Sequence, residues 1–375
     1  MRTSFLLAFL SSTVYSTLAA PSAAGVAITK RAGPVKANSY LVKLKSGVSK
    51  ASHLAGLSGI TGSKIAYTYD QVFQGYAVEL QGKALDYVRQ SKDVEYIVQD
   101  SIVSIHDRCS LASGVVESAK RETGEPHLGK RTGGAGVDVY QIDTGIYTAH
   151  TQFGGRAKWG TTFGGYPNAD GNGHGTALAS LIVGSTYGPA NKANITAIKT
   201  FGDDGSANLS DIIQGINWVI TTAGATTRPA IISLTVTIAG YQPFDTAVKS
   251  ATDKGIHVVV AAGDTNEDAS GYSPGRAASA VTVGAILANG SKLSTSNFGA
   301  AVDIWGPGAT AKCAWTSSST ASVNLVGTTA SAASNVAGIL AVEIEKYGNK
   351  APAALETDLK SHAKTVNGYL VAQQW

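Results

Sequence analysis

Three clusters of polar residues carry side chains suited to acid–base and nucleophilic chemistry. Asp143 directly follows an apolar, strand-like segment. His174 lies in a glycine-rich loop at residues 172–176 that leads into an apolar helical segment. Thr328 and Thr329 open the last long helical segment. An orienting carboxylate, an imidazole base and a hydroxyl at a helix N-terminus are the groups needed for nucleophilic acyl transfer, in which helix N–H groups stabilise an oxyanion.

Each of these residues also has a purely structural interpretation. An aspartate after a strand forms turns, a histidine caps helices, and threonine at a helix start is an ordinary cap. A third interpretation, an aspartic protease, requires two paired carboxylates. The chain contains one Asp-Thr-Gly sequence, at Asp143, and no second Asp-Thr-Gly or Asp-Ser-Gly. The residue types therefore exclude the aspartic protease and leave the catalytic and structural interpretations open.

From residue 137 onward, apolar strand-like segments alternate with helical ones. Strands are expected at 137–142, 195–199, 230–234, 256–262 and 280–284, and helices at 175–183, 210–220, 246–254 and 329–347. This alternation predicts an α/β fold, a parallel sheet with helices on both faces. In such folds, sites collect at the carboxyl ends of the strands, where Asp143 lies. Residues 137–375 are therefore expected to form the domain that carries the site.

A separate, smaller unit precedes this domain. Residues 38–105 contain strand-like segments at 40–44, 73–80 and 94–100 and a helical segment at 83–90, which predicts a small α+β domain. The domain lacks a convincing cluster of chemical groups, so a structural or inhibitory role is expected. Residues 106–136 are charged and glycine-rich without apolar periodicity, as is typical of a junction.

The N-terminus is typical of a secreted protein. Residues 1–20 have a charged start, an apolar core and a small-residue end, the pattern of a signal peptide. Residues 21–37 form a linker that contains Lys30-Arg31, which is either a dibasic processing site or an exposed basic pair. No segment has the ~18 uninterrupted apolar residues of a membrane helix. We therefore expect an extracellular protein without a membrane partner.

Composition and isolated motifs agree with that compartment. The net charge is only +4 and the basic residues are scattered, so nucleic acid is not an expected partner. Cys109 and Cys313 either form one disulfide or remain thiols. Asn-x-Ser/Thr sequences at Asn194, Asn208 and Asn289 predict N-glycosylated surface loops. A monomer is expected.

Several motifs in one order resemble secreted fungal subtilisin-like serine proteases of the proteinase K branch. They span most of residues 137–350: Tyr140-Gln141-Ile142-Asp143-Thr144-Gly145, Asp170-Gly171-Asn172-Gly173-His174-Gly175-Thr176, Val259-Val260-Ala261-Ala262-Gly263, Tyr272-Ser273-Pro274, Ser296-Asn297-Phe298-Gly299, Asp303-Ile304-Trp305-Gly306-Pro307-Gly308 and Asn335-Val336-Ala337-Gly338. Residues 38–105 similarly resemble the inhibitory propeptide of that family. The resemblance implies a subtilisin-like fold, the chain's own propeptide as a partner, and propeptide removal near residues 105–109.

The resemblance also implies roles for individual residues. Asp143 becomes the triad aspartate and His174 the triad base. Counting from Gly327 places Thr329 at the position of the nucleophilic serine, whereas counting back from Gly338 places Ala330 there. The oxyanion asparagine of the family is replaced by Asp264. The implied substrate-binding residues are Ser233, Leu234, Thr235 and Gly263.

Departures from the family pattern concern every part of the reaction. Thr329 keeps a hydroxyl but crowds it with a methyl group, and Ala330 has none. An ionised Asp264 would repel an oxyanion. Residues 235–240 replace a glycine-rich edge with β-branched side chains that narrow the approach of a peptide. Residues 286–288 lack the acidic ligand of a family calcium site, so no metal or other cofactor is expected, and the final strand of the family is not recognisable before Trp375.

The sequence thus predicts a secreted homologue of subtilisin-like serine endopeptidases that is weakly active or inactive. Its ligand would be a polypeptide substrate or another peptide. The alternative is a non-catalytic pseudoprotease that binds peptides, inhibitors or a host partner.

Overall fold

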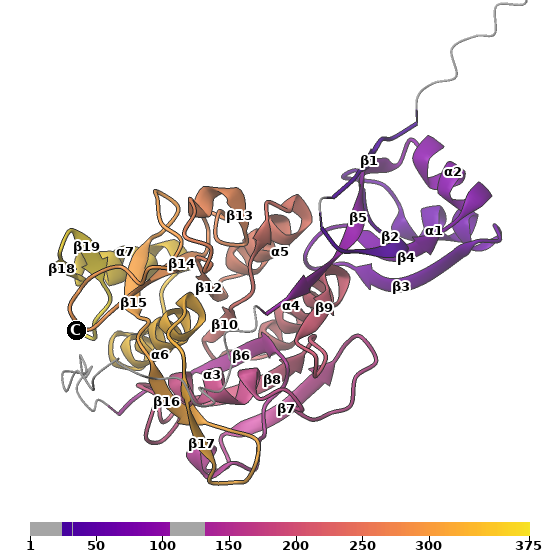
Figure 1. Cartoon of the computed structure of the whole chain (residues 1–375). Helices are drawn as coiled ribbons and strands as arrows, with labels where there is room; N and C mark the ends of the chain where they lie inside the picture. The colour runs from indigo at the N-terminus through magenta and orange to yellow at the C-terminus, as the bar shows by residue number, and fades with distance from the viewer. Residues whose placement is uncertain (1–24, 32, 106–131) are drawn as a thin grey trace, which may run out of the picture.

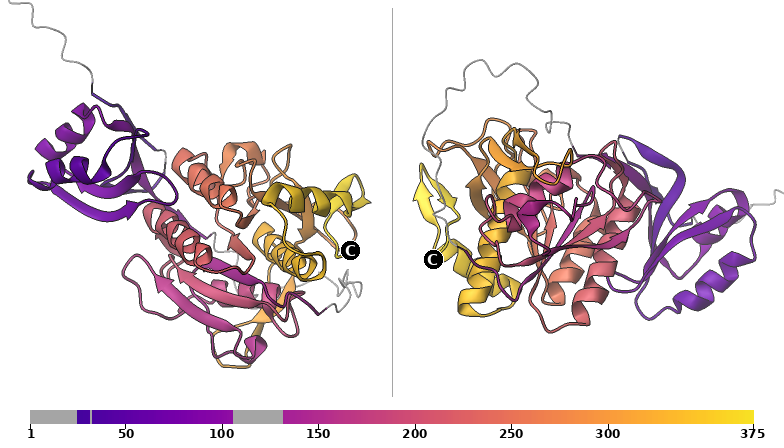
Figure 2. Two further views of the ribbon diagram at one scale, coloured as in Figure 1. Left: turned by 180° about the vertical axis from the view of Figure 1, so that it is seen from behind. Right: turned by 90° about the horizontal axis from the view of Figure 1, so that it is seen from below.

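The structure, a computed structural model, describes residues 25–31, 33–105 and 132–375. They form an N-terminal domain (residues 25–105) and a body (residues 132–375) that lie side by side in all views (Figures 1 and 2). The predicted signal peptide and Cys109 lie outside the described residues. Within these ranges no helix has the length and apolar character needed to cross a bilayer.

The N-terminal domain is a sheet with two helices on one face. The strand order is β1 (Ile28–Thr29), β5 (Val94–Ser104), β2 (Val35–Leu44), β4 (Gly75–Leu80) and β3 (Ser63–Tyr69), and the helices are α1 (Lys50–Ser58) and α2 (Gly82–Gln90). Alternate residues of β2 face opposite sides, as the two-residue period of a strand requires. Tyr40 and Val42 pack with α1 and α2, whereas Leu41 packs into a core shared with the body.

The body is built on a nine-stranded sheet. Its order is β18 (Lys364–Val366), β19 (Tyr369–Val371), β15 (Ile304–Pro307), β14 (Val281–Ile286), β12 (His257–Ala261), β10 (Ala230–Leu234), β6 (Asp138–Asp143), β8 (Asn194–Lys199) and β7 (Ala157–Thr162). All neighbouring strands are parallel except β18 and β19. The predicted parallel sheet is therefore confirmed.

Helices cover both faces of this sheet, as predicted. α4 (Leu209–Gly224) and α5 (Gln242–Asp253) pack on the face that carries Tyr140 and Ile142, and α3 (His174–Val183) and α6 (Thr329–Tyr347) pack on the face that carries Val139. The other elements of the body are η1 (Thr151–Phe153), β9 (Ser206–Asn208), β11 (Ile238–Ala239), η2 (Ala269–Gly271), β13 (Tyr272–Ser273), β16 (Ala311–Ala314), β17 (Ser322–Leu325) and α7 (Pro352–Ser361).

The sequence predicted no recognisable final strand before Trp375, and this prediction is wrong. β18 and β19 form a hairpin after α7, and β19 pairs with β15 through Trp305 and Val371. Asn367 and Gly368 connect them with φ values of 49° and 85°, both in the left-handed region that a two-residue hairpin turn requires. The Asn-Gly pair was the sequence signal for this hairpin.

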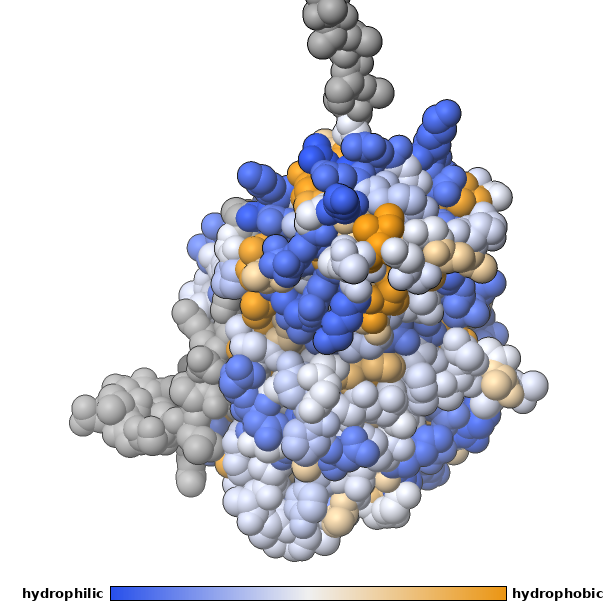
Figure 3. Space-filling view, turned by 90° about the vertical axis from the view of Figure 1, so that its right-hand side faces the viewer, coloured by the Kyte–Doolittle hydropathy of each residue, from blue (hydrophilic) through white to orange (hydrophobic). Residues whose placement is uncertain are grey.

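The two domains share one apolar core. Leu41, Val72, Phe73, Val98 and Val103 of the N-terminal domain lie in the same buried cluster as side chains of α4 and α5. Over the N-terminal domain, the surface facing the viewer in Figure 3 alternates apolar and hydrophilic side chains. The large exposed apolar side chains in the described part of the chain are isolated: Ile65 lies on β3, Tyr347 on α6, Leu370 on β19, and Phe298 and Val326 lie in two different loops.

Candidate active site

Asp143 ends β6, a central strand of the body sheet, and is buried. Its Oδ1 accepts a hydrogen bond from the Thr144 amide at 2.7 Å, and its Oδ2 lies 3.4 Å from the Thr235 hydroxyl. The carboxylate therefore has fixed partners in addition to any histidine, as an orienting group requires.

His174 is the first residue of α3 and meets Asp143. Its Nδ1 lies 2.8 Å from Asp143 Oδ1 and 3.0 Å from Oδ2. Burial of the ring lowers the pKa of His174, but the charge and hydrogen bond of Asp143 and the charge of Asp170 outweigh burial, so the net pKa is raised. The preceding Gly173 has φ 99°, and a Cβ there would lie 2.7 Å from the ring of Trp315. Only glycine therefore fits this turn without strain.

Asp170 connects the segments that carry Asp143 and His174. It was not predicted as a site residue. Its Oδ1 accepts from the Thr144 hydroxyl at 2.8 Å and the Gly173 amide at 2.8 Å. Its Oδ2 accepts from the amide and hydroxyl of Thr176 at 2.9 and 2.6 Å. One buried carboxylate thus ties the turn after β6 to the first turn of α3. Its place four residues before His174 in the glycine-rich motif was the available signal.

The threonine at the start of α6 has partners other than this pair. The Thr329 amide donates to Asp264 Oδ1 at 3.0 Å and its hydroxyl donates to Oδ2 at 2.8 Å. The same hydroxyl accepts from the Gly263 amide at 3.2 Å. Thr329 is fully buried, and among the hydrogen bonds of the described residues none joins it to His174. The structure therefore brings Asp143 to His174 and Thr329 to Asp264, as two separate pairs.

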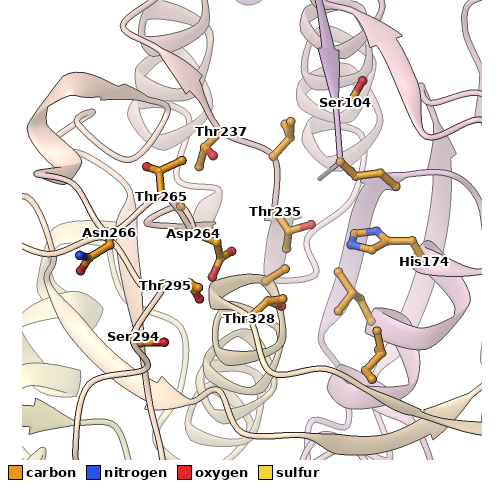
Figure 4. A pocket seen from close by; sticks show the side chains of 16 residues that line it. Ser104, His174, Thr235, Thr237, Asp264, Thr265, Asn266, Ser294, Thr295 and Thr328 are labelled. Carbon is orange, nitrogen blue, oxygen red and sulfur yellow. The ribbon is translucent and has the colours of Figure 1, made fainter. Parts of the chain in front are cut away.

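A cavity of about 660 Å³ lies between the two pairs. His174 projects into it from one side and Asp264 from the other, with Thr235 and Thr328 between them (Figure 4). Ala330 lines this cavity, whereas Thr329 does not. The two ways of counting the nucleophile position therefore differ in the structure, because Ala330, the residue counted back from Gly338, lines the cavity and Thr329, the residue counted from Gly327, does not.

The predicted substrate-binding residues divide in the same way. Thr235 and Gly263 line the cavity. Ser233 and Leu234 do not, because they lie inside β10 and are buried by the strands and helices on both faces. The chain begins to line the cavity only after Leu234, the last residue of β10. Its extension, Val236 and Thr237, adds two further β-branched side chains to the wall.

The last strand of the N-terminal domain enters the same cavity. β5 pairs antiparallel with β9, with Ile102 opposite Asn208 and Ser104 opposite Ser206. The Ile105 amide continues the ladder by donating to the Gly205 carbonyl at 3.0 Å. Ser104 and Ile105 then line the cavity together with His174. The cavity thus receives an extended segment of the chain itself.

The two alternatives for Cys109 and Cys313, one disulfide or two thiols, and the expected absence of a metal remain predictions. Cys313 is buried in β16, and its suggested partner Cys109 is not described. Residues 286–288, where the family resemblance implies a calcium ligand, are Ile, Leu and Ala. In residues 25–31, 33–105 and 132–375, no group of three or more His, Cys, Asp or Glu side chains is arranged to hold a metal ion.

Two of the three predicted glycosylation sites are not in surface loops. Asn194 begins β8 and donates its side-chain amide to Asp138 at 3.0 Å. Asn208 ends β9 and donates to Asp211 at 2.9 Å. Asn289 alone of the three is exposed in a turn. The loop prediction is therefore wrong for Asn194 and Asn208, which are half-buried and belong to strands.

Comparisons with known proteins agree across both domains. The subtilase family model matches residues 134–374, and the model of the peptidase inhibitor I9 matches residues 39–106. Subtilisin-like protease 2 of Pseudogymnoascus destructans is 35% identical over 86% of this chain and 84% of its own length. Proteinase R of Parengyodontium album is 35% identical over 82% of this chain and 80% of its own. The crystal structure of a cold-adapted subtilisin-like serine proteinase superposes with a TM-score of 0.60 at 32% identity, covering 66% of this chain and 89% of that one.

Proposed function

Because the chain belongs to the subtilase family and carries an I9-type inhibitor domain, we propose that it is a secreted, monomeric member that binds extended peptide without hydrolysing it. The predicted resemblance to subtilisin-like proteases and their propeptide is confirmed by these matches. The step from protease family to peptide-binding pseudoprotease rests on the start of α6.

The observation that carries the proposal is the hydrogen bonding of Thr329. Nucleophilic attack requires a hydroxyl that gives its proton to a base. The Thr329 hydroxyl instead donates to Asp264, and removing that proton would place two negative charges within hydrogen-bond distance, which is unfavourable. Ala330, which lines the same cavity as His174, has no group to ionise. Neither residue supplies the missing serine.

The oxyanion position supports the same conclusion. A helix N-terminus stabilises a developing oxyanion through free N–H groups. Here the Thr329 amide is bound to the Asp264 carboxylate. An internal anion therefore occupies a donor that a substrate oxyanion would use, and its charge would repel that oxyanion. Loss of one such donor lowers kcat by about 10²–10³-fold.

The peptide-binding half of the site remains. β9 accepts β5 as an antiparallel neighbour, and such strand addition obtains affinity from backbone hydrogen bonds with little dependence on sequence. The cavity beyond Ile105 is lined mainly by hydroxyls and by short apolar side chains. A second extended polypeptide could use these same partners once the chain's own segment leaves. We therefore expect peptide binding without turnover.

The assembled Asp143–His174 pair is the observation that favours the other candidate, weak hydrolysis through Thr329. In that case Asp264 would have to be protonated, which requires acid or a raised pKa. The raised pKa of His174 works against turnover in acid, because an imidazolium cannot accept the hydroxyl proton. The two candidates therefore differ in their pH dependence as well as in the amount of product.

Assays of the secreted full chain separate these candidates. We expect no peptide hydrolysis from acid to alkaline pH and no self-cleavage near residues 105–109. The double variant A330S/D264N adds a hydroxyl to the wall of the cavity that His174 also lines, together with an uncharged oxyanion donor, and we expect it to gain His174-dependent cleavage. The matched control T329S/D264N should gain nothing. Self-cleavage of the unmodified chain that H174A abolishes would overturn the proposal.

A further inference from the structure

The N-terminal segment 25–31, here called the strap, lies outside the matched inhibitor domain. The inhibitor model begins at residue 39, yet the strap is built into the structure. β1 pairs parallel with β5, with Ile28 opposite Ile97 and Thr29 opposite Val98. Val26 donates to the Arg89 carbonyl at 2.6 Å. These contacts attach the strap to the inhibitor sheet, so that its last residue is delivered at a defined place.

That last residue, Arg31, reaches across to the body. Its two terminal nitrogens donate to the carbonyl oxygens of Ala239 and Gly240, each at 2.5 Å. Its guanidinium carbon lies 4.9 Å from the centre of the Tyr241 ring. Ala239 ends β11, and Gly240 and Tyr241 connect it to α5. Arg31 thus meets the body at a place separate from the pairing of β5 with β9.

The contact is reinforced from both sides of the interface. The Arg31 amide donates to the side-chain oxygen of Gln99 at 3.0 Å, and the Tyr241 hydroxyl donates to the Gln99 carbonyl at 2.9 Å. Tyr241 is 1% exposed, so its ring cannot move aside. Gln99 of β5 therefore holds both the arginine and the tyrosine, and the three residues form a closed set of contacts across the two domains.

The chemistry of the contact suits arginine. A planar guanidinium offers parallel N–H donors to two neighbouring carbonyls and stacks on an aromatic face at the same time. Lysine carries the same charge as a single point and cannot make both interactions with this geometry. The neighbouring Lys30 is exposed and has no such contact with the body in the described structure. The basic pair is therefore asymmetric, with one solvated residue and one docked residue.

We infer that the strap is a lock that holds the inhibitor domain on the body, with Arg31 as its anchor. The dibasic pair noted in the sequence thus has a binding role in addition to any processing role. The lock acts on association of the two domains and does not depend on whether the site hydrolyses peptide. A test of binding therefore distinguishes its failure from failure of the proposed function.

The test uses the full chain with a site for a specific protease inserted among residues 110–130. After cutting in the presence of a reductant, so that no disulfide between Cys109 and Cys313 holds the halves, the release of the inhibitor domain is followed by size-exclusion chromatography. We expect R31A to release the domain at least tenfold faster than the unmodified chain, R31K to lie between them, and K30A, the matched control, to behave like the unmodified chain. Release of R31A at the unmodified rate would overturn the inference.

A second measurement guards against a folding defect in R31A. Hydrogen exchange on the uncut chain should rise in residues 26–31 and 238–241 and stay unchanged in β2 and β4, which form the interior of the inhibitor sheet. Unchanged exchange at residues 238–241 would show that Arg31 does not hold that loop, and would also overturn the inference.

Discussion

At the scale of residues, the histidine and the threonine of the site are each hydrogen-bonded to a carboxylate. Asp143 binds the imidazole of His174, and Asp264 binds the hydroxyl and amide of Thr329. In a working acyl-transfer site the imidazole and the hydroxyl bind each other. Here each is bound to its own acid, which explains how the parts of a protease can be present and still be separated.

The Asp143–His174 pair predicts a pH-dependent stability. The pKa of His174 is raised in the folded protein, so the pair contributes stability that is full below the unfolded pKa of about 6.5 and is lost as pH rises through the folded pKa. D143N removes the negative charge beside His174 but leaves its ring buried. Burial alone disfavours the imidazolium. Denaturant unfolding should therefore show that D143N destabilises the chain more at pH 5.5 than at pH 9.

The isosteric variant D303N serves as the control, because Asp303 lies in another part of the body with Lys360. It should show no such trend linked to His174. A D143N effect that is equal at both pH values would contradict the prediction. NMR titration of the His174 ring provides a direct check, since its pKa should fall in D143N and remain unchanged in D303N.

At the scale of elements, local sequence patterns identified most helices and strands but not their partners. α6 was expected at residues 329–347 and lies there, because its apolar period and its threonine cap are local signals. The partner of Thr329, Asp264, follows a different strand, so no local pattern reveals the bond. β5 was expected at 94–100 but continues to Ser104, because its last residues pair with β9 of the other domain. Tertiary pairing extends a strand beyond its own propensity.

The same limit applies to glycosylation, and it yields a prediction. The sequons at Asn194, Asn208 and Asn289 look alike in sequence, but only Asn289 is exposed in a turn. Its side-chain oxygen accepts from the Ser291 amide at 2.9 Å, and no hydrogen bond within the described residues engages its side-chain nitrogen. In a eukaryotic secretion host we expect a glycan at Asn289 alone. N289Q should abolish the mass shift removed by endoglycosidase, whereas N194Q and N208Q should leave it unchanged.

At the scale of the whole molecule, the inhibitor domain and the body are held together by polar groups placed around a shared apolar core. Tyr67 donates to Asp211 at 2.7 Å, and Asn217 accepts from the amides of residues 70–72. Asp100 is the buried carboxylate of this interface. It accepts from the Ser210 amide and hydroxyl at 3.0 and 2.7 Å and from Ser39 at 3.2 Å. It therefore caps α4 of the body from the other domain.

Asp100 makes domain association pH-dependent. Burial raises its pKa to about 6 against the opposing hydrogen bonds of Ser210, and the charge of Asp211 raises it further. A docked pKa above the ordinary value of about 3.9 means that docking is strongest in acid and weakens as pH rises through about 6. Tyr67, Tyr69 and Tyr241 also face this group, but their pKa values are raised and they stay neutral over this range.

Release of the inhibitor domain from the cut chain should therefore accelerate between pH 4 and pH 7. D100N keeps the shape and an acceptor oxygen without the titrating proton, so its release rate should be flat over that range and close to the acid value of the unmodified chain. An equally steep pH response in D100N would assign the effect to another group.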